Sequence, residues 1–209
     1  MRVSLPLVAS LALMTVIARA ETPAQVPGPA PQEIMQKASA RLLSALEADR
    51  EGYRKDVRKL NELVETELLP YFDTEYSARL VLGKHWRDAS PSQRNRFIKA
   101  FYHSLLGKYG TAVAGFTSDR LRVLPFQGDL GSGRATVRTE IQLNDGTLIP
   151  VNYSLRATAS GWKAWDVTIE GISYVKNFRN DIGSEVGQRG LDAVITRLEA
   201  EARAGGLGG

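Results

Sequence analysis

Two carboxylates near the end of one predicted strand are the first candidates for chemistry in this chain. Asp166 and Glu170 are separated by an even number of positions, so a strand places both on the same face. Paired carboxylates serve as acid and base in glycosidases, and with His103 they would complete a hydrolytic site. No second polar cluster accompanies them. We therefore expect Asp166 to occupy a polar strand face and Glu170 to bond the backbone where the strand ends.

Other catalytic and metal-binding patterns are weak. The chain contains no cysteine, and its two histidines, His85 and His103, are not spaced as HxxxH or HxxE. We expect a loop position for His85 and a helix-surface position for His103. No serine lies in GxSxG, and no helix follows the glycine pair at 131–133 to hold a phosphate. The sequence therefore predicts no catalytic residue, no metal and no cofactor, and so a protein that is not an enzyme.

Around the carboxylates the residues are mostly apolar, and their spacing changes at Gly171. The residues before the glycine alternate as in a strand, with Trp165, Val167 and Ile169 on one face and Ala164 on the other. After the glycine, apolar residues recur at helical spacing. The sequence therefore predicts a strand that leads directly into a helix and presents a continuous apolar surface.

Helical periodicity dominates the first half of the chain and returns after this segment. Asp73 is a candidate N-cap, and Ser90 followed by Pro91 is a strong helix start. Pro70 and Gly83 are stop signals. The helices that we expect cover residues 33–49, 57–69, 73–83, 90–109, 174–186 and 189–202.

Between the helical regions the apolar residues alternate with a period of two, which is typical of strands with one buried face. Asn144-Asp145-Gly146 predicts a tight hairpin turn. Helices, then an antiparallel meander, then helices is the order of an α+β fold, with a curved four-stranded antiparallel sheet packed against several helices. Such a sheet can enclose an apolar cavity between the layers. The expected strands cover residues 120–126, 135–143, 147–157 and 162–169.

The N-terminal residues are typical of a secretory signal peptide, with a basic start, an apolar run and small residues before Ala20. We expect cleavage after Ala20 and a soluble protein of the periplasm. Loss of Arg2 and Arg19 lowers the formal net charge from +4 to about +2, which does not suggest nucleic-acid binding. The expected organisation is a signal peptide at 1–20, a disordered proline-rich linker at 21–31, one domain at 32–203 and a flexible tail at 204–209.

Several motifs resemble one family in order and spacing. They are LLPYF at 68–72, LVLG at 80–83 with Trp86, SPSQR at 90–94 with Phe97 and Phe101, WKAWDV at 162–167, and EGIS at 170–173 with Arg179. Together they are similar to the MlaC family of periplasmic phospholipid-binding proteins, also called toluene-tolerance proteins. The resemblance covers about residues 33–198, whereas the glycine-rich tail matches nothing in it.

The resemblance implies a lipid-binding fold of the NTF2- or cystatin-like kind and a role as a carrier. A member of this family shuttles a diacyl phospholipid between an inner-membrane ABC transporter with an MCE-domain protein and an outer-membrane lipoprotein complex, and so maintains the lipid asymmetry of the outer membrane. We expect a monomer with bound phospholipid as cargo. The expected cavity lining is Leu80, Phe97, Phe101, Leu105, Tyr109, Val137, Ile141, Val151, Tyr153, Trp165, Val167, Ile169, Ile172 and Val175.

Two other functions fit the same pattern of elements. An exported hydrolase would use Asp166 and Glu170 inside the pocket. A chaperone for lipoproteins or outer-membrane proteins would bind acylated peptide in place of phospholipid. The chemical nature of any lipid that copurifies with the protein distinguishes the carrier from both.

Overall fold

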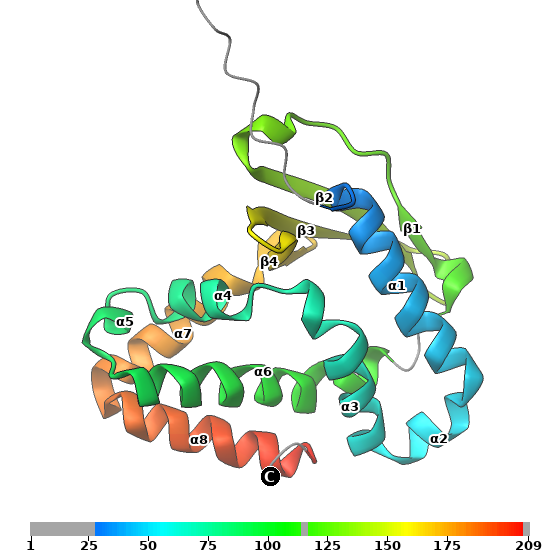
Figure 1. The fold of residues 1–209 in the computed structure, drawn as a ribbon. Helices are drawn as coiled ribbons and strands as arrows, with labels where there is room; N and C mark the ends of the chain where they lie inside the picture. Colours follow the sequence, from blue (N-terminus) through cyan, green and yellow to red (C-terminus); the bar gives the residue numbers. More distant parts are fainter. Residues whose placement is uncertain (1–27, 114–116, 207–209) are drawn as a thin grey trace, which may run out of the picture.

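The computed structural model describes residues 28–113 and 117–206. The predicted signal peptide, the linker up to residue 27 and the last residues of the predicted tail lie outside these ranges. An antiparallel sheet forms one layer and a group of helices the other, with α1 crossing the sheet at one end and α8 on the side of α6 away from the sheet (Figure 1). The predicted α+β class is confirmed.

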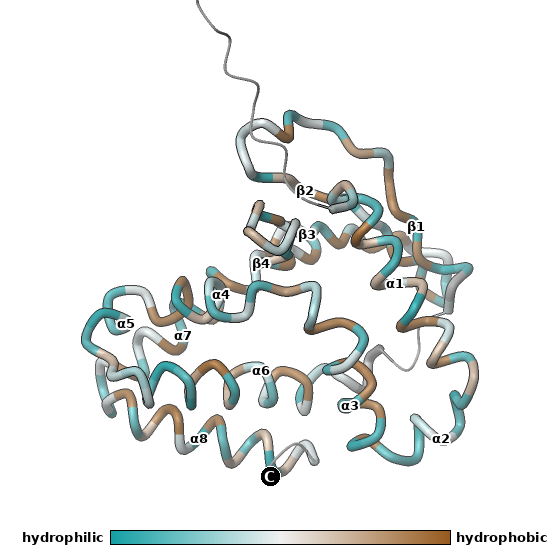
Figure 2. Tube along the Cα trace, in the orientation of Figure 1, coloured by the Kyte–Doolittle hydropathy of each residue, from teal (hydrophilic) through white to brown (hydrophobic). Residues whose placement is uncertain are grey.

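The predicted helices are present in the predicted order, and the structure adds short helices, one of which begins at His85, a residue that we predicted in a loop. Asp73 caps α4 through the amide of Tyr76, and Ser90 and Gln93 exchange hydrogen bonds in a capping box at the start of α6. Hydropathy alternates along α6 and α8, as expected for amphipathic helices (Figure 2). The α-helices are α1 (Pro31–Ala48), α2 (Arg50–Lys55), α3 (Val57–Glu67), α4 (Thr74–Leu82), α5 (His85–Asp88), α6 (Pro91–Val113), α7 (Tyr174–Arg189) and α8 (Leu191–Ala204), and the 3-10 helices are η1 (Leu69–Tyr71), η2 (Ser118–Arg120) and η3 (Leu130–Ser132).

The sheet contains five strands where we predicted four. They run antiparallel in the order of the chain, and the additional strand pairs with the end of β4. Glu170 and Gly171 form the two-residue turn between them with φ values of 50° and 83°, as a tight hairpin requires. The predicted first strand is shorter than expected, because η2 occupies its start and Pro125 lacks a donor for the ladder. The strands are β1 (Leu121–Val123), β2 (Arg134–Gln142), β3 (Leu148–Thr158), β4 (Gly161–Ile169) and β5 (Ile172–Ser173).

A bulge in β4 changes the predicted faces of that strand. Tyr153 pairs with Val167 but Leu155 pairs with Ala164, so Trp165 is an extra residue on β4. Ala164 therefore lies on the inner face with Val167 and is fully buried, although we predicted it on the opposite face. Strict alternation cannot reveal a bulge, because one extra residue exchanges the two faces of the strand.

Helix α1 covers one end of the inner sheet face. Ile34 and Met35 on α1 pack in a buried cluster with Val137, Leu155 and Trp162 of the sheet. The contacts of α1 include β1, β2 and β4. This part of the interface is a closed hydrophobic core.

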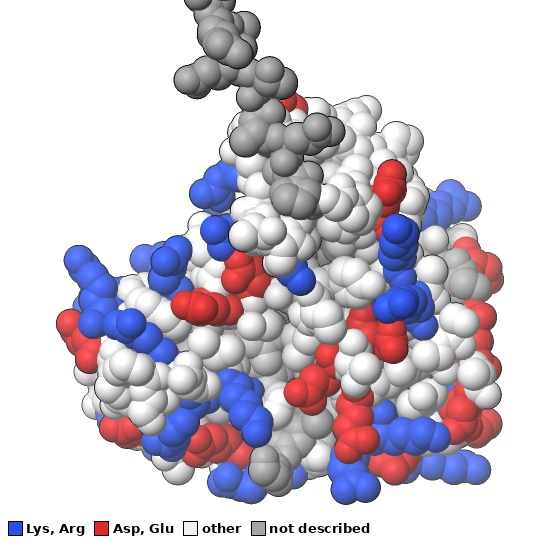
Figure 3. Space-filling model, viewed as in Figure 1, with Lys and Arg blue, Asp and Glu red and all other residues white. Residues whose placement is uncertain are grey.

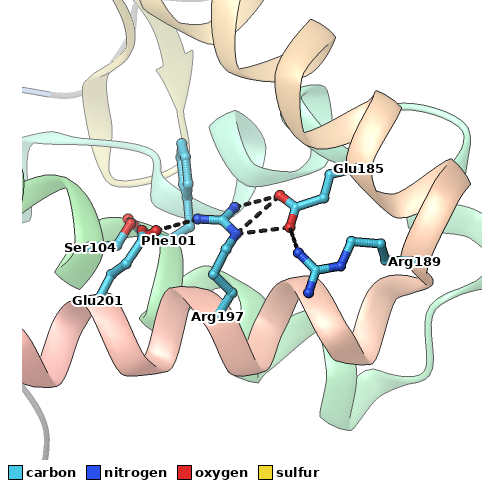
Figure 4. Close-up of polar contacts among 6 residues, drawn as sticks. All are labelled: Phe101, Ser104, Glu185, Arg189, Arg197 and Glu201. Carbon is cyan, nitrogen blue, oxygen red and sulfur yellow. Dashed lines mark hydrogen bonds and ion pairs between the residues drawn. The ribbon is translucent and has the colours of Figure 1, made fainter.

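The helical layer has a core of its own and a set of ion pairs. Phe97 is fully buried there among residues of α4, α6, α7 and α8. Arg197 on α8 donates to both carboxylate oxygens of Glu185 on α7, at 2.7 to 3.1 Å, and to Glu201 one turn further along α8 (Figure 4). Arg189 also contacts Glu185 at 3.3 Å. These contacts hold α7 and α8 together.

The start of the predicted flexible tail is fixed to the helical layer. Helix α8 continues to Ala204, and the carbonyl of Gly205 accepts a hydrogen bond of 2.9 Å from the buried side chain of Asn61. Gly205 also lies against Gly107, where a Cβ added to Gly205 would stand 2.4 Å from the Gly107 Cα. Two facing glycines thus permit a close backbone contact that composition alone did not indicate.

Candidate functional site

An apolar cavity of about 390 Å³ lies between the sheet and the helical layer. The sheet contributes one wall, α6 and the start of α7 the opposite wall, and the segment from α3 to α4 the side. Its lining residues are Val64, Leu68, Leu69, Phe72, Ser77, Phe101, Tyr102, Leu105, Leu106, Tyr109, Gly110, Ile141, Val151, Tyr153, Trp165, Asp166, Val167, Ile169, Tyr174, Val175 and Phe178.

Most of the predicted lining residues are in this wall. The structure brings together those on the second half of α6, on the inner sheet face beyond α1, and at the start of α7. These are Phe101, Leu105, Tyr109, Ile141, Val151, Tyr153, Trp165, Val167, Ile169 and Val175.

Four predicted residues lie elsewhere. Phe97 is in the core of the helical layer and Val137 is under α1, and both are almost fully buried. Ile172 is 60% exposed on β5, the edge strand of the sheet, although its ladder partner Ile169 lines the cavity. Leu80 is half-buried on α4 and outside the lining. Each has the right residue type and spacing for the cavity wall. The elements packed around it, or the lack of a covering element, place it in a core or at the surface instead.

The residues that sequence reasoning missed come mainly from the segment between α3 and α4 and from the start of α7. Leu68, Leu69 and Phe72 belong to the LLPYF motif, which carried the family resemblance without a structural role. Tyr174 and Phe178 share the helical stripe of Val175, so the spacing contained a signal for them.

The segment that contains Phe72 is fastened to the sheet by its backbone. Phe72 forms a parallel bridge with Ala164, and the amide of Asp73 donates to the Ala164 carbonyl at 2.7 Å. The hydroxyl of Ser77 then donates to the carbonyls of Asp73 and Trp165. The side wall of the cavity is therefore joined to the edge of β4.

Asp166 supports the junction between β4 and α7. One carboxylate oxygen accepts from the Ser173 hydroxyl at 2.6 Å and the other from the Val175 amide at 3.0 Å. Ser173 in turn caps α7 through the amide of Lys176. Glu170 is exposed in the hairpin turn, and its amide donates to the Pro150 carbonyl at 3.1 Å. Asp166 thus supports the junction through its carboxylate, whereas Glu170 contributes through its backbone amide.

The predicted hydrolytic partner of these carboxylates has another contact. His103 Nε2 lies 3.1 Å from Glu65 Oε1, which joins α6 to α3, and His103 is not part of the cavity lining. Within residues 28–113 and 117–206, no group of three or more His, Cys, Asp or Glu side chains is placed to hold a metal ion.

Aromatic rings cross from α6 to α7 along the cavity. Tyr109 contacts Tyr174 with ring centroids 5.9 Å apart, Tyr174 contacts Phe178 at 6.0 Å, and Phe178 contacts Phe101 at 5.3 Å. Tyr109 is 39% exposed, so it marks the rim, whereas Phe101 is buried. These rings link the two helices that form one wall.

Two tyrosines of the cavity wall have raised pKa values. Burial raises the pKa of Tyr102 to about 12, although a hydrogen bond with Ser77 acts in the opposite direction. Burial alone raises the pKa of Tyr153 to about 12. Both phenols therefore stay neutral at ordinary pH in surroundings that disfavour charge.

The cavity has two neighbouring chambers. A chamber of about 100 Å³ beneath α1 shares Leu68, Ile141 and Tyr153 with it. A second, of about 540 Å³, lies between α6, α7 and α8 beside the ion pairs of Figure 4, behind a wall that includes Phe101 and Phe178.

Positive and negative side chains are interspersed over the face shown in Figure 3. No helix in the described part of the chain is long and apolar enough to cross a membrane.

Comparisons with known proteins agree with the predicted resemblance. The chain is 29% identical over 177 residues to the intermembrane phospholipid transport system binding protein MlaC of Haemophilus influenzae, across 82% of each chain. It is 29% identical over 189 residues to the toluene tolerance protein ttg2D of Pseudomonas putida, across 90% of this chain and 83% of that protein.

Its fold is similar to that of the phospholipid-binding protein from Ralstonia solanacearum, solved in complex with a phospholipid, with a TM-score of 0.76 and 21% identity over 84% of this chain and 98% of that chain. The likeness confirms a fold with helices packed on an antiparallel sheet. The family model described as MlaC protein matches residues 36–200. Because that match spans most of the sequence, the chain belongs to the MlaC family.

Proposed function

We propose that this chain binds a phospholipid with the acyl chains in the cavity and carries it between membranes. The observation that supports the proposal best is the apolar cavity of about 390 Å³ in a chain of the MlaC family. Its walls consist mainly of aliphatic and aromatic side chains from both layers. The relatives named above as phospholipid transport and phospholipid-binding proteins favour the same ligand.

The energetics of lipid transfer require such a cavity. Exposing an acyl chain of about 15 methylenes to water costs about 12 kcal/mol, at roughly 0.8 kcal/mol for each methylene. Free diffusion of a two-chain lipid through an aqueous space is therefore negligible. A carrier must cover the chains, and it can leave the headgroup in solvent.

The polar groups at the cavity favour a carrier over a hydrolase. Both oxygens of Asp166 accept hydrogen bonds from the β4–α7 junction, and His103 contacts Glu65. A general base needs an oxygen or nitrogen within reach of the proton that it removes. Asp166→Asn is the direct check, because a hydrolase would lose activity with this change.

The setting and the partners complete the proposal. The N-terminal sequence pattern supports export to the periplasm with cleavage after Ala20, and we expect the protein to act there as a monomer. There the protein would exchange lipid with an inner-membrane ABC transporter that has an MCE-domain component, and with an outer-membrane lipoprotein complex. This exchange would maintain the lipid asymmetry of the outer membrane.

The first experiment identifies what the purified protein contains. The exported full chain is extracted with organic solvent, and the extract is analysed by mass spectrometry. We expect diacyl phospholipid at nearly one molecule per protein. Lipid-free protein would overturn the proposal, and acylated peptide would identify the chaperone instead.

A pair of variants places the lipid in the cavity. Val167 lines it, whereas the adjacent Thr168 pairs with Asn152 on the other face of the sheet. Val167→Trp fills the cavity, so we expect it to lose most of the copurified phospholipid, while Thr168→Trp keeps it. Equal lipid content in the two variants would show that the lipid binds elsewhere.

A further inference from the structure

Tyr153 is one of four tyrosines that line the cavity, and its ring lies deep in the wall. It lies in the middle of β3, where its neighbours across the sheet are Val137 and Val167. Within the described part of the chain its hydroxyl makes no hydrogen bond. The side chains of these two direct neighbours are apolar and offer no acceptor.

Two other polar side chains of the cavity wall have partners within the protein. Ser77 donates to backbone carbonyls, and Asp166 accepts from Ser173 and Val175. Once an apolar lipid fills the cavity, a hydroxyl left there without a partner would cost about 1–3 kcal/mol. A Phe at position 153 would fill nearly the same space without this cost, so the hydroxyl calls for a partner that arrives with the ligand.

The position of the ring shows where such a partner would lie. Burial raises the pKa of Tyr153, so the phenol is deep in the molecule, yet the side chain remains partly accessible. The phenol can be both deep in the molecule and partly accessible if its accessible part faces an internal space. Tyr153 indeed lines both the cavity of about 390 Å³ and the chamber of about 100 Å³ beneath α1.

We propose that the Tyr153 hydroxyl donates a hydrogen bond to an oxygen atom of the bound lipid and so determines which lipids the cavity prefers. The oxygen comes from one of two sources with the same acceptor chemistry, an ester carbonyl of the glycerol backbone or a hydroxyl on an acyl chain. This proposal rests on the proposed function, because it requires a lipid in the cavity. It adds selectivity at the chains to a site whose walls are otherwise mainly apolar.

A site built around a hydrogen bond discriminates against ligands that lack the matching atom, because the buried donor is then left unpaired. A lipid without an accessible oxygen at Tyr153 should therefore bind about 5- to 10-fold more weakly than one that supplies it. Tyr153→Phe removes the donor and with it the discrimination. The variant should fold normally, because it deletes only a hydroxyl that has no partner in the described structure.

The experiment uses delipidated full chain and three phosphatidylcholines of equal chain length: a diester lipid, its diether analogue, and a diether lipid with a hydroxyl on one chain. Competition between pairs of lipids is read by native mass spectrometry for the wild type, Tyr153→Phe and Tyr71→Phe. Tyr71 packs outside the cavity and is the matched control. Thermal unfolding of all three proteins checks that they are folded.

Each outcome decides the proposal. A wild-type preference for the diester over the plain diether lipid that Tyr153→Phe abolishes and Tyr71→Phe retains identifies the ester carbonyl. A preference for the hydroxylated over the plain diether lipid, lost in the same variant, identifies the chain hydroxyl. Equal binding of all three lipids by the wild type, or a preference that survives in Tyr153→Phe, overturns the proposal while lipid binding itself stands. Failure of every lipid to bind would overturn the proposed function together with it.

Discussion

The inner face of the sheet has two halves that are similar in residue type and different in environment. The packed half consists of Ala135, Val137, Leu155, Trp162 and Ala164, and α1 covers it with a closed core. The cavity half consists of Ile141, Val151, Tyr153, Val167 and Ile169, and it faces the cavity. Both halves use the same strands, β2, β3 and β4.

The difference shows that the covering element creates the site. Helix α1 supplies Ile34 and Met35 to fill the space over the packed half. Over the cavity half, α6 and α7 contribute the opposite wall, and a cavity of about 390 Å³ remains between the layers. A cavity of this kind contributes little to stability, because atoms at its surface lack packing partners on one side. We therefore expect the packed half to stabilise the fold and the cavity half to bind ligand.

The largest expected effect is on stability, from truncation in the packed half. Leu155 is fully buried, so Leu155→Ala should lower the free energy of unfolding by about 2–5 kcal/mol. Ile169→Ala in the cavity half should cost clearly less, because it enlarges a space that already exists. Urea denaturation of the delipidated proteins measures both values. Similar losses in the two variants would mean that the cavity half is packed in solution as tightly as the other half.

High pH should weaken the cavity half next. The raised pKa of Tyr153, about 12 against an ordinary 10.0, means that its contribution to stability is complete below pH 10 and is lost as the pH rises through about 12. Two pKa units correspond to about 3 kcal/mol. Tyr102 should behave in the same direction. Spectrophotometric titration of tyrosinate in the wild type and in Tyr153→Phe follows the individual phenols.

That titration has a clear opposing result. The chain has seven tyrosines, and burial should delay Tyr102 and Tyr153. If all of them ionise together near pH 10 in the folded protein, the cavity half is open to water and the contrast with the packed half is smaller than the structure indicates.

Much of this architecture could be predicted from local signals. Asp73 and Ser90 mark helix starts by their capping chemistry, and Asp145-Gly146 marks the hairpin, since such signals act within a few residues. The bulge at Trp165 could not be predicted, because it depends on pairing with β3 across the sheet. The contact of Gly205 with Gly107 likewise joins residues far apart in the chain.

The site was only partly predictable for a related reason. Phe97 and Phe101 lie one turn apart on α6 with stacked rings, and both belong to the helical core, yet only Phe101 also lines the cavity. Val137 and Val151 show the same division on the sheet. Sequence spacing identifies the face of an element, whereas position along that face relative to α1 decides between core and cavity.

Enlarging a side chain should also distinguish the two halves. Val137→Phe adds volume to the closed cluster around Ile34 and Met35, away from the chamber beneath α1, and should lower the free energy of unfolding by about 1–3 kcal/mol. Val151→Phe should be nearly neutral for stability, because it extends into the cavity, and should reduce the phospholipid content instead. Denaturation and lipid extraction on the same preparations give both readings. A destabilised Val151→Phe that keeps its lipid would reverse the assignment of the halves.

The smallest expected change concerns the connection between the cavity half and α7. Asp166 holds the start of α7 through Ser173 and Val175, and Asp166→Asn weakens charge-assisted hydrogen bonds while keeping one acceptor oxygen. We expect a loss of about 1 kcal/mol in unfolding free energy, with faster exchange of lipid between protein and vesicles, because α7 carries part of the cavity wall.

Thr139, whose buried hydroxyl donates to the Val151 carbonyl, provides the control. Thr139→Val should also lower stability, but without faster lipid exchange, since it disturbs the sheet and leaves α7 in place. If both variants change lipid exchange equally, general destabilisation rather than the β4–α7 junction controls release. If Asp166→Asn alone accelerates it, the junction is the part of the cavity half that must loosen when lipid leaves.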